Sequence, residues 1–521
     1  MTSSSTKGRQ SRTDLDARTL SSPAADTPTS GSARRLSHLA IKGVAWSAAQ
    51  ALGSRLLTIL TFIVLAHLLG PRSFGIVAFA SVAIAFLNTF VALGLAQAIV
   101  QIPTLEKRHL DTAFWVSNGL GLLLAVAVVA SSWPLARLFH VPAAAPVLQV
   151  LSLGFLFTAL ASCPTAILQR RMAFRSIALR FTVGSLVGAV AGIGLALLGA
   201  GVWSLVAQTL CTSATGLVVL WSAAGWRPGL AVDRATFSEL FGFSRNVVGM
   251  GVAGFVLGRT DDFFIGAFLG PALLGIYSVA YRLLVVLMEA TISTVEAVAL
   301  PTFSRLQGDR ARLRRAYFSA TRISAVVALP VFFFILAAAP EVIHVFFGSR
   351  WERSIPVMRV LAIVGVANTL TNFNATLLMS LGKPGRALRF MTIASVANVI
   401  GIAIAVHWGI VAVAAAVVLR NCLVGSPLSI KYVKEALGFT LADYFRSYLT
   451  PMLASIPVVL LVLAEHAVLS GSAGNIIRLL LMTASSALTY VTAVALFDRT
   501  LLGEVRSYLR SMVSRTITAR T

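Results

Sequence analysis

Long runs of apolar residues, separated by short polar stretches, make up most of the chain. Each run reaches about 18 mostly apolar positions or more, the length that a helix needs to cross the hydrocarbon core of a membrane. The runs are 42–68, 74–99, 112–133, 147–168, 177–198, 201–222, 244–268, 273–299, 318–339, 356–380, 389–407, 410–430, 447–466 and 474–496. The pattern therefore predicts an all-α polytopic membrane protein with about 14 transmembrane helices.

The two ends of the chain depart from this pattern. Residues 1–40 are rich in Ser, Thr, Pro and small residues, so they cannot bury a core and predict a disordered cytoplasmic tail. They also lack the short apolar run and the small-residue cleavage site of a signal peptide, so we expect the first helix to act as its own insertion signal. Residues 497–521 predict a second, basic cytoplasmic tail.

Basic residues are distributed unequally between the two sides of the predicted membrane. The chain has 43 Lys and Arg against 19 Asp and Glu, a formal net charge of +24. In this topology the loops on one side hold only four basic residues, Arg72, Arg137, Arg350 and Arg353, and the tails and opposite loops hold most of the others. This is the positive-inside rule, and it predicts that both termini are cytoplasmic. The surplus charge then reflects topology and contact with anionic membrane lipids, so no nucleic-acid partner is expected.

A short phrase occurs twice at a constant distance along the chain. LLGPRSFGIVAFAS begins at Leu68, and FLGPALLGIYSVAY begins at Phe268. Further along, GAGVWSLVAQ at 199–208 is similar to HWGIVAVAAA at 407–416. Helices 1–6 and 7–12 therefore form two copies of a six-helix unit, related by an axis along the membrane normal because six is even. The repeated phrase is then the extracytoplasmic hairpin of each copy, where Gly and Pro make the turn.

The repeat also predicts how the chain divides into parts. These are an N-terminal six-helix bundle at 41–222, a cytoplasmic linker at 223–243, a C-terminal six-helix bundle at 244–430, and helices 13 and 14 within 431–496. Helices 13 and 14 have no counterpart in the repeat, so we expect them outside the repeated core.

Helix 1 carries a polar face. Ser47, Gln50, Ser54 and Thr58 follow one another at steps of three and four, which places them on one side of a helix. Arg55 lies beside them, and a charge at this depth is costly unless it faces a bundle interior or a water-filled cavity. Because helix 1 has no acid next to Arg55, we expect Arg55 and Gln50 to line a cavity.

Helices 7 and 8 carry the other deep charges. Arg259 and Asp262 are three positions apart and can form an ion pair on one helix face, while Asp261 points elsewhere. Arg282 and Glu289 lie seven positions apart on helix 8, and so along one stripe. Two interpretations of the Arg259–Asp262 pair stay open: it pins the packing of helix 7, or it lines a cavity.

Other polar side chains within the helices are expected to have structural roles. Four arginines near helix ends extend toward lipid headgroups. Four asparagines either line the cavity or bond across helices, and packing is the favoured role. The arginines are Arg180, Arg322, Arg420 and Arg478, and the asparagines are Asn368, Asn372, Asn398 and Asn421.

Several stretches, taken in order, resemble one transporter family. They include LAHLLGPRSFG, DDFFIGAFLGPALLGIYSVAYRL, LPTFSRLQGDRARLRRAY and HVFFGSRWERSIPVMRVLAI. They resemble the polysaccharide transporter family, the Wzx-type oligosaccharide flippases of the multidrug/oligosaccharidyl-lipid/polysaccharide exporter superfamily. The resemblance implies two parallel six-helix repeats around a V-shaped cavity, in a bacterial inner (cytoplasmic) membrane. It also implies a cargo of undecaprenyl-diphosphate-linked oligosaccharide, flipped for the biosynthesis of exopolysaccharide, capsule or lipopolysaccharide.

The deep charges suit such a cargo. Guanidinium groups form forked hydrogen bonds with phosphate oxygens, so an arginine-lined cavity can hold a lipid diphosphate. The expected substrate-binding residues are Gln50, Arg55, Arg259, Asp262 and Arg282. The residues expected to couple alternating access to H⁺ or Na⁺ are Asp261, Asp262 and Glu289. Polysaccharide polymerase and export machinery are further expected partners, and no cofactor or metal is expected.

Other functions stay open at this point. A multidrug or cation antiporter of the same superfamily is the nearest alternative, followed by a peptidoglycan-precursor flippase. An integral membrane glycan polymerase or acyltransferase would be a different class, an enzyme. Against an enzyme, the seven His residues are scattered, the three Cys residues have no metal-ligand spacing, and no loop is long enough for a catalytic domain.

Overall fold

The fold is all-helical in the part of the chain that the computed structural model describes. This part comprises residues 56–91, 98–100, 105–469 and 474–498, with the single residues 53, 102 and 503. Within it, twelve helices are long and apolar enough to cross a membrane, and they match twelve of the expected spans. The two other expected spans correspond to the shorter helix Leu56–Leu68 and to the charged helix α10, which fall outside that set. The all-α membrane class is confirmed, and the count of fourteen stays a prediction.

Short connections join most of the helices. The helices are α3 (Pro71–Val91), α5 (Lys107–Leu138), α6 (Ala144–Leu151), α7 (Leu153–Arg170), α8 (Phe174–Leu197), α9 (Val202–Ala224), α10 (Arg234–Phe264), α11 (Pro271–Arg305), α12 (Arg310–Phe346), α13 (Ser354–Ser380), α14 (Pro384–Ala405), α15 (Ile410–Arg420), α16 (Ser426–Leu437), α17 (Leu441–Leu469) and α18 (Asn475–Phe497). A π-helical turn follows α10 (Ile265–Leu269), and another joins α15 to α16 (Asn421–Gly425).

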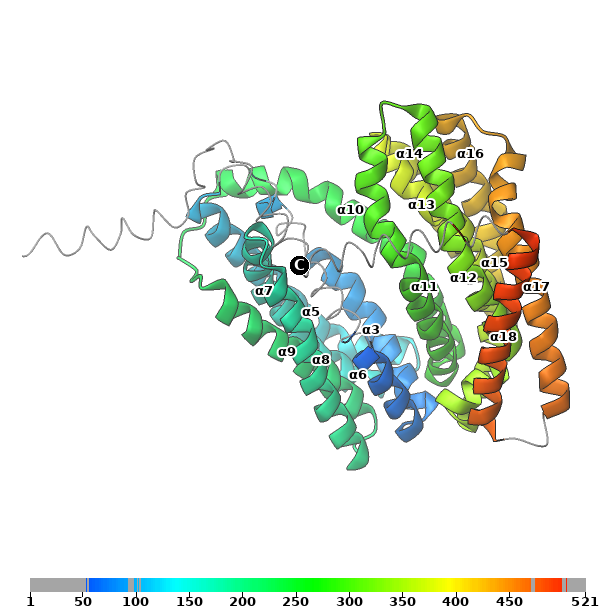
Figure 1. The fold of residues 1–521 in the computed structure, drawn as a ribbon. Coiled ribbons are helices and arrows are strands. Elements are labelled where there is room, and N and C mark those ends of the chain that lie inside the picture. Colours follow the sequence, from blue (N-terminus) through cyan, green and yellow to red (C-terminus); the bar gives the residue numbers. More distant parts are fainter. Residues whose placement is uncertain are drawn as a thin grey trace, which may run out of the picture.

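Two groups of helices lie on either side of α3 and α11 (Figure 1). Helices α5 to α9 form one group, and α12 to α18 form the other. Between the groups, α3 and α11 pack against each other. Helix α10 reaches both groups, since Leu240 near its start packs with Leu110 and Cys163 of the first group. The later part of α10 packs on α14 of the second group.

The connection between α9 and α10 is shorter than the linker predicted at 223–243, because α10 already begins within it. Asp233 caps the new helix start: its carboxylate accepts hydrogen bonds from the backbone N–H groups of Ala235 (3.3 Å) and Thr236 (3.0 Å). The Thr236 hydroxyl also donates to this carboxylate. The hydroxyl first, and then the backbone donors, lower the pKa of Asp233 below its ordinary value. Hydropathy alone did not reveal this helical segment because it is polar.

The repeated phrase forms the contact between α3 and α11. A Cβ atom on Gly75 would lie 1.5 Å from the carbonyl oxygen of Pro271, and a Cβ atom on Gly275 would lie 1.9 Å from that of Pro71. The contact is reciprocal, as expected of two copies related by a two-fold axis, and it leaves no room for a side chain. The repetition is therefore a packing requirement, because only glycine lets the two hairpins meet backbone to backbone.

The residues after α12 hold the same end of the molecule together. Trp351 is fully buried, and its indole N–H donates to the carbonyl oxygen of Ala66 at 3.1 Å. Its ring also meets that of Phe74 edge-on, with centroids 5.4 Å apart. The Ser354 hydroxyl donates to the carbonyl oxygen of Ile276 at 2.8 Å. Both hairpins are thus tied to one loop.

The C-terminal pair α17 and α18 packs on α12 and is tied to it at both ends. Near one end, the fully buried carboxylate of Glu341 contacts His466 of α17 and lies 3.6 Å from the Arg478 guanidinium of α18. Near the other end, Arg322 of α12 pairs with Asp498. The expectation that Arg478 extends toward lipid headgroups is wrong: it is only 8% exposed, because it lies beside a buried acid.

Candidate functional site

Two arginines lie at the same depth on neighbouring helices. Helices α10 and α11 form a hairpin around Gly270, and Arg259 and Arg282 each lie roughly 17 Å from it at 1.5 Å per residue. The Arg259 side chain is 47% exposed. Arg282 is exposed too, and its guanidinium lies 5.9 Å from the centre of the Phe62 ring on helix Leu56–Leu68. The two positive charges are close enough to interact with each other.

Arg259 is partly neutralised from its own helix. Its Nη1 donates to Oδ2 of Asp262 at 2.9 Å, in the geometry that a spacing of three allows. The Asp262 side chain is only 4% exposed, and its Oδ1 has no hydrogen-bond partner among the described residues. A ligand that draws the guanidinium away would therefore leave a buried carboxylate without its counter-ion.

Asp261 faces the interior of the second helix group instead. The hydroxyl of Tyr277 on α11 donates to Oδ2 of Asp261 at 2.6 Å, and both side chains are buried. One turn further on, the Tyr281 hydroxyl donates to the carbonyl oxygen of Gly258 at 3.3 Å. Asp261 and Asp262, although consecutive on α10, thus lie in two different environments: Asp261 bonds Tyr277 of α11, and Asp262 pairs with Arg259.

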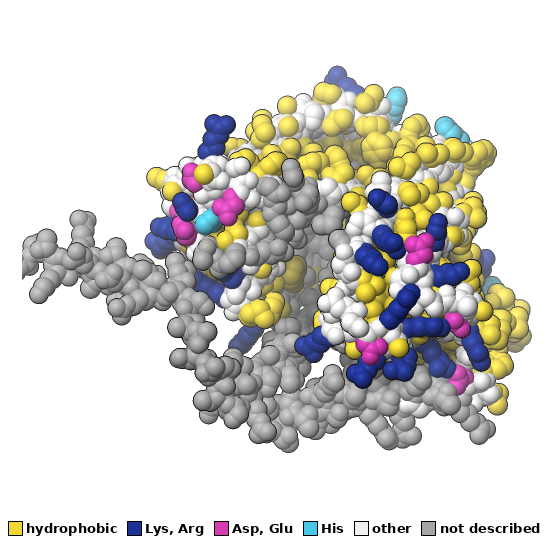
Figure 2. Space-filling view, turned by 90° about the horizontal axis from the view of Figure 1, so that it is seen from above, with side chains coloured by type: hydrophobic (Ala, Val, Ile, Leu, Met, Phe, Trp, Pro, Cys, Tyr) yellow, Lys and Arg dark blue, Asp and Glu magenta, His cyan; other side chains and the backbone are white. Residues whose placement is uncertain are grey.

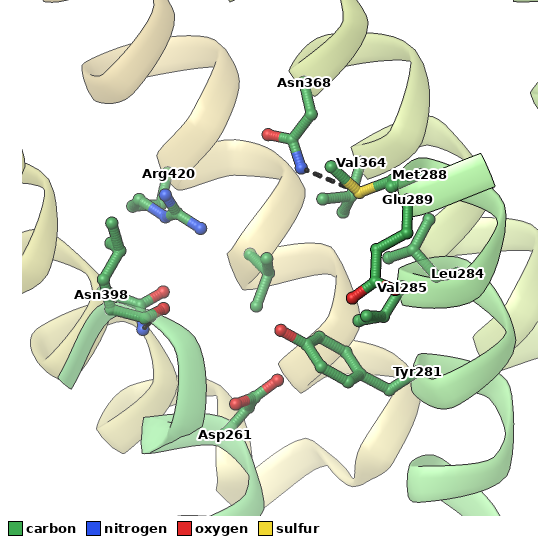
Figure 3. Close-up of a pocket in the computed structure, with 12 residues that line it drawn as sticks. Asp261, Tyr281, Leu284, Val285, Met288, Glu289, Val364, Asn368, Asn398 and Arg420 are labelled. Atoms are coloured by element: carbon green, nitrogen blue, oxygen red, sulfur yellow. Dashed lines mark hydrogen bonds between the residues drawn. The ribbon is translucent and has the colours of Figure 1, made fainter. Parts of the chain in front are cut away.

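A cavity of about 330 Å³ lies among α10, α11, α13, α14 and α15 (Figure 3). Its polar lining consists of Asp261, Tyr281, Glu289, Asn368, Asn398 and Arg420. Its apolar lining consists of Leu257, Leu284, Val285, Met288, Val364 and Val417. Figure 3 shows Arg420 and Asn398 across the cavity from Tyr281 and Glu289. An apolar wall with a few convergent polar groups is typical of a small-molecule site.

The sequence analysis missed Arg420 as a cavity residue, and the expectation that it extends toward headgroups is wrong. The apolar segment continues from Ile410 to Leu437, so Arg420 lies inside it rather than at its end. The next five residues form a π-helical turn, Asn421–Gly425, and such turns often occur at functional sites. The sequence signal for this cavity residue was Arg420 deep within an apolar segment and followed directly by Asn421.

The predicted site residues fall into three sets. Arg259 and Asp262 pair on α10, and Arg282 lies at the same depth on α11. Asp261 and Glu289 line the cavity. Gln50 and Arg55 lie outside the described residues.

A family model described as "Polysaccharide biosynthesis protein" matches residues 64–356, which include both hairpins and both arginines. The chain belongs to this family. It is 31% identical to "Succinoglycan biosynthesis transport protein ExoT" of Rhizobium meliloti (strain 1021), over 62% of this chain and 65% of that protein. It is 24% identical to "Lipopolysaccharide biosynthesis protein WzxC" of Escherichia coli (strain K12), over 90% of this chain and 96% of that protein.

Two solved structures share the fold. "Lipid II flippase MurJ, inward closed conformation" has a TM-score of 0.71 at 15% identity, covering 88% of this chain and all of that one. An inward-facing multidrug resistance MATE family transporter of the MOP superfamily has a TM-score of 0.58 at 20% identity, covering 74% of this chain and 96% of that one. The family and the apolar helices make this protein a multi-span membrane protein of polysaccharide biosynthesis.

Proposed function

We propose that this family member is a flippase for undecaprenyl-diphosphate-linked oligosaccharide in the cytoplasmic membrane of a bacterium. It works by alternating access and supplies surface polysaccharide biosynthesis, with polymerase and export machinery as downstream partners. The named transport and biosynthesis proteins among its relatives support this assignment. The fold shared with a lipid II flippase is consistent with it.

One observation carries the proposal: Arg259 and Arg282 present two accessible guanidinium groups at one depth inside the membrane. A diphosphate offers two anionic groups, and each guanidinium can form forked, charge-assisted hydrogen bonds with one of them. Arg55 and Gln50 of helix 1 are proposed to complete this site from the other repeat. Such a site disfavours the cationic drugs of a multidrug antiporter, because like charges repel.

Asp262 is the proposed link between cargo and a coupling ion. Cargo phosphate competes with Asp262 for Arg259, whose side chain is far more exposed than that of Asp262. The displaced carboxylate is buried, so it then favours binding of H⁺ or Na⁺ over remaining an unpaired charge. Asp261 and Glu289 stay proposed coupling residues of the neighbouring cavity. This order would make uptake of the ion follow binding of the cargo.

The proposed orientation in the membrane is supported by the basic end of the molecule. Figure 2 views the molecule from above, and many Lys and Arg side chains lie on the end that it shows. At this end the starts of α12, α14 and α17 meet the end of α16, through the ion pairs Arg314–Asp443 (2.9 Å) and Arg386–Glu435 (3.2 Å). We propose that this end is cytoplasmic, along with both termini, and contacts anionic lipids.

Complementation of a strain lacking the gene tests the function. Arg259→Ala is expected to abolish surface polysaccharide while protein stays at normal levels in the membrane, and Arg259→Lys is expected to retain part of the export. Arg446→Ala, which removes an exposed arginine near the start of α17, serves as the control. Export at the wild-type level by Arg259→Ala would overturn the proposed site.

A further inference from the structure

We propose that the cavity among α10, α11, α13, α14 and α15 is a sugar subsite, which takes one sugar residue of the glycan that the diphosphate carries. The proposal rests on the proposed function. It assigns to Asn398 and Arg420 the selection of the glycan, a task separate from holding the phosphates.

The hydrogen-bonding groups of the cavity call for a ligand that both donates and accepts. Asn398 lines the cavity and is 2% exposed, and its Oδ1 accepts no hydrogen bond from any residue that the structure describes. The buried Nε–H of Arg420 has no acceptor in the part of the chain that the structure describes. Buried polar groups in native structures are nearly always paired, so an unpaired acceptor and an unpaired donor in one cavity need an explanation.

A sugar satisfies both kinds of group. Each hydroxyl donates one hydrogen bond and accepts others, so neighbouring hydroxyls can serve the Asn398 oxygen and the Arg420 guanidinium at once. A metal cation bound at the Asn398 oxygen would be repelled by Arg420. An anion would suit Arg420 but would meet the carboxylates of Asp261 and Glu289. The mixed set therefore favours a neutral, polyhydroxylated ligand.

The size and the walls of the cavity fit one sugar ring. Its volume of about 330 Å³ is at the lower end of the range for small-molecule sites, about 300–1,000 Å³. The wall opposite α10 is held in place, since Asn421 donates to Asn368 at 3.3 Å and Asn368 donates to the sulfur of Met288 at 3.5 Å. Walls that are fixed before binding make a site selective.

The cavity also lies next to the proposed phosphate site. Its lining residue Glu289 is exposed and interacts electrostatically with Arg282. The two residues are two helical turns apart on α11, or about 10 Å at 1.5 Å per residue. A sugar bonded directly to a diphosphate at Arg282 would therefore lie close to the mouth of the cavity.

Binding measurements on the purified full-length chain in nanodiscs test the proposal. The probes are a short-chain polyprenyl diphosphate without sugar and the same lipid diphosphate carrying one sugar residue, across a panel of common hexoses and N-acetylhexosamines. For the wild type, at least one sugar is expected to strengthen binding about tenfold, the effect of one or two net hydrogen bonds. Asn398→Ala is expected to lose this gain while the sugar-free lipid still binds through Arg259 and Arg282.

Asn372→Ala is the matched control, because Asn372 is another amide of the membrane helices and does not line the cavity. It is expected to keep the gain from the sugar. If the wild type binds the sugar-free lipid and no sugar adds affinity, the subsite is wrong but the flippase proposal stands. If the sugar-free lipid does not bind at all, the proposed function itself fails. If Asn398→Ala keeps the sugar gain and instead loses the H⁺ or Na⁺ dependence of transport, the cavity is an ion site.

Discussion

At the scale of single residues, the unequal surroundings of Arg259 and Asp262 matter most. The guanidinium is half-exposed, whereas the carboxylate bonded to it is buried. An anion approaching between the helices can reach the arginine without displacing other side chains from the core. Asp262 therefore competes with an anionic ligand for Arg259 and so lowers the affinity of Arg259 for it. Arg259 in turn supplies the positive charge that balances the buried Asp262 carboxylate.

Replacing the acid should strengthen binding of the diphosphate. Asp262→Asn keeps the shape of the side chain and removes the charge that competes for Arg259. Charge-assisted hydrogen bonds contribute about 1.5–3 kcal/mol, so a short-chain polyprenyl diphosphate is expected to bind roughly tenfold tighter or more. Titration of the purified chain measures this. Asp309→Asn, at an acid paired with Arg312 at 3.1 Å outside the membrane span, is the control, and unchanged or weaker binding by Asp262→Asn contradicts the account.

The residues of the site could be predicted only where the contacts are local. Arg259 and Asp262 are three positions apart on one helix, so helix geometry alone predicts their contact. Asn398 and Arg420 belong to different helices, and the cavity between them exists because α14 and α15 pack around α10 and α11. No periodicity in one segment encodes which face of another segment it meets.

At the scale of elements, the contact between the two hairpins joins α3 and α11, the helices that lie between the two helix groups. Each needs glycine because the other hairpin occupies the space of its side chain. The repeat in the sequence thus reflects a symmetric contact. Because of this symmetry, the effect on stability of a substitution at Gly75 should depend on the residue at 275, and the reverse.

A double-mutant cycle can detect this interdependence. Gly75→Ala and Gly275→Ala should each lower stability by about 1–3 kcal/mol or more, because each side chain overpacks the contact. The double variant should cost less than the sum, since one separation of the hairpins makes room for both methyl groups. Unfolding of the purified chain measures this, with Gly194→Ala in α8 as a control because a Cβ there meets open space. Strictly additive costs would mean that the two positions act independently.

The attachment of α17 and α18 to α12 can be tested through the buried cluster around Glu341. Arg478→Met removes one partner of a fully buried carboxylate and is expected to destabilise the chain by about 3–5 kcal/mol. Adding Glu341→Met should recover much of this loss, because an apolar pair replaces a buried charge. Arg322→Met should cost less, since the side chains of Arg322 and Asp498 are 26% and 20% exposed. If Arg478→Met and Arg322→Met lowered stability equally, burial would not explain the strength of the Glu341 cluster.

At the scale of the whole molecule, the hydrophobic pattern predicted the class of fold and twelve spans directly, because membrane helices must be long and apolar. The repeat predicted two equivalent hairpins. The course of α10 was harder to predict: its first turns are polar, and they are helical because Asp233 caps them and Leu240 packs on the first helix group. Tertiary contacts, rather than local hydropathy, extend this helix.

The proposed orientation can be tested at two exposed arginines at the opposite ends of α12. In a background with Cys163, Cys211 and Cys422 replaced by Ala, an impermeant maleimide added to intact cells should label Arg350→Cys and not Arg310→Cys. Permeabilised cells should show labelling of both. Labelling of Arg310→Cys in intact cells would reverse the topology, and with it the direction from which cargo enters.

The central claim is that Arg259 and Arg282 hold the diphosphate of a lipid-linked sugar during transport. The most direct measurement is flipping by the full-length chain in liposomes, with a fluorescent diphosphate-linked sugar lipid and an impermeant reductant that bleaches only the outer leaflet. Liposomes with the wild type or Arg446→Ala should lose clearly more than half of the fluorescence, because flipping exposes inner-leaflet lipid. Arg259→Ala with Arg282→Ala should stop at about half, as protein-free liposomes do. Flipping by this double variant at the wild-type rate would contradict the claim.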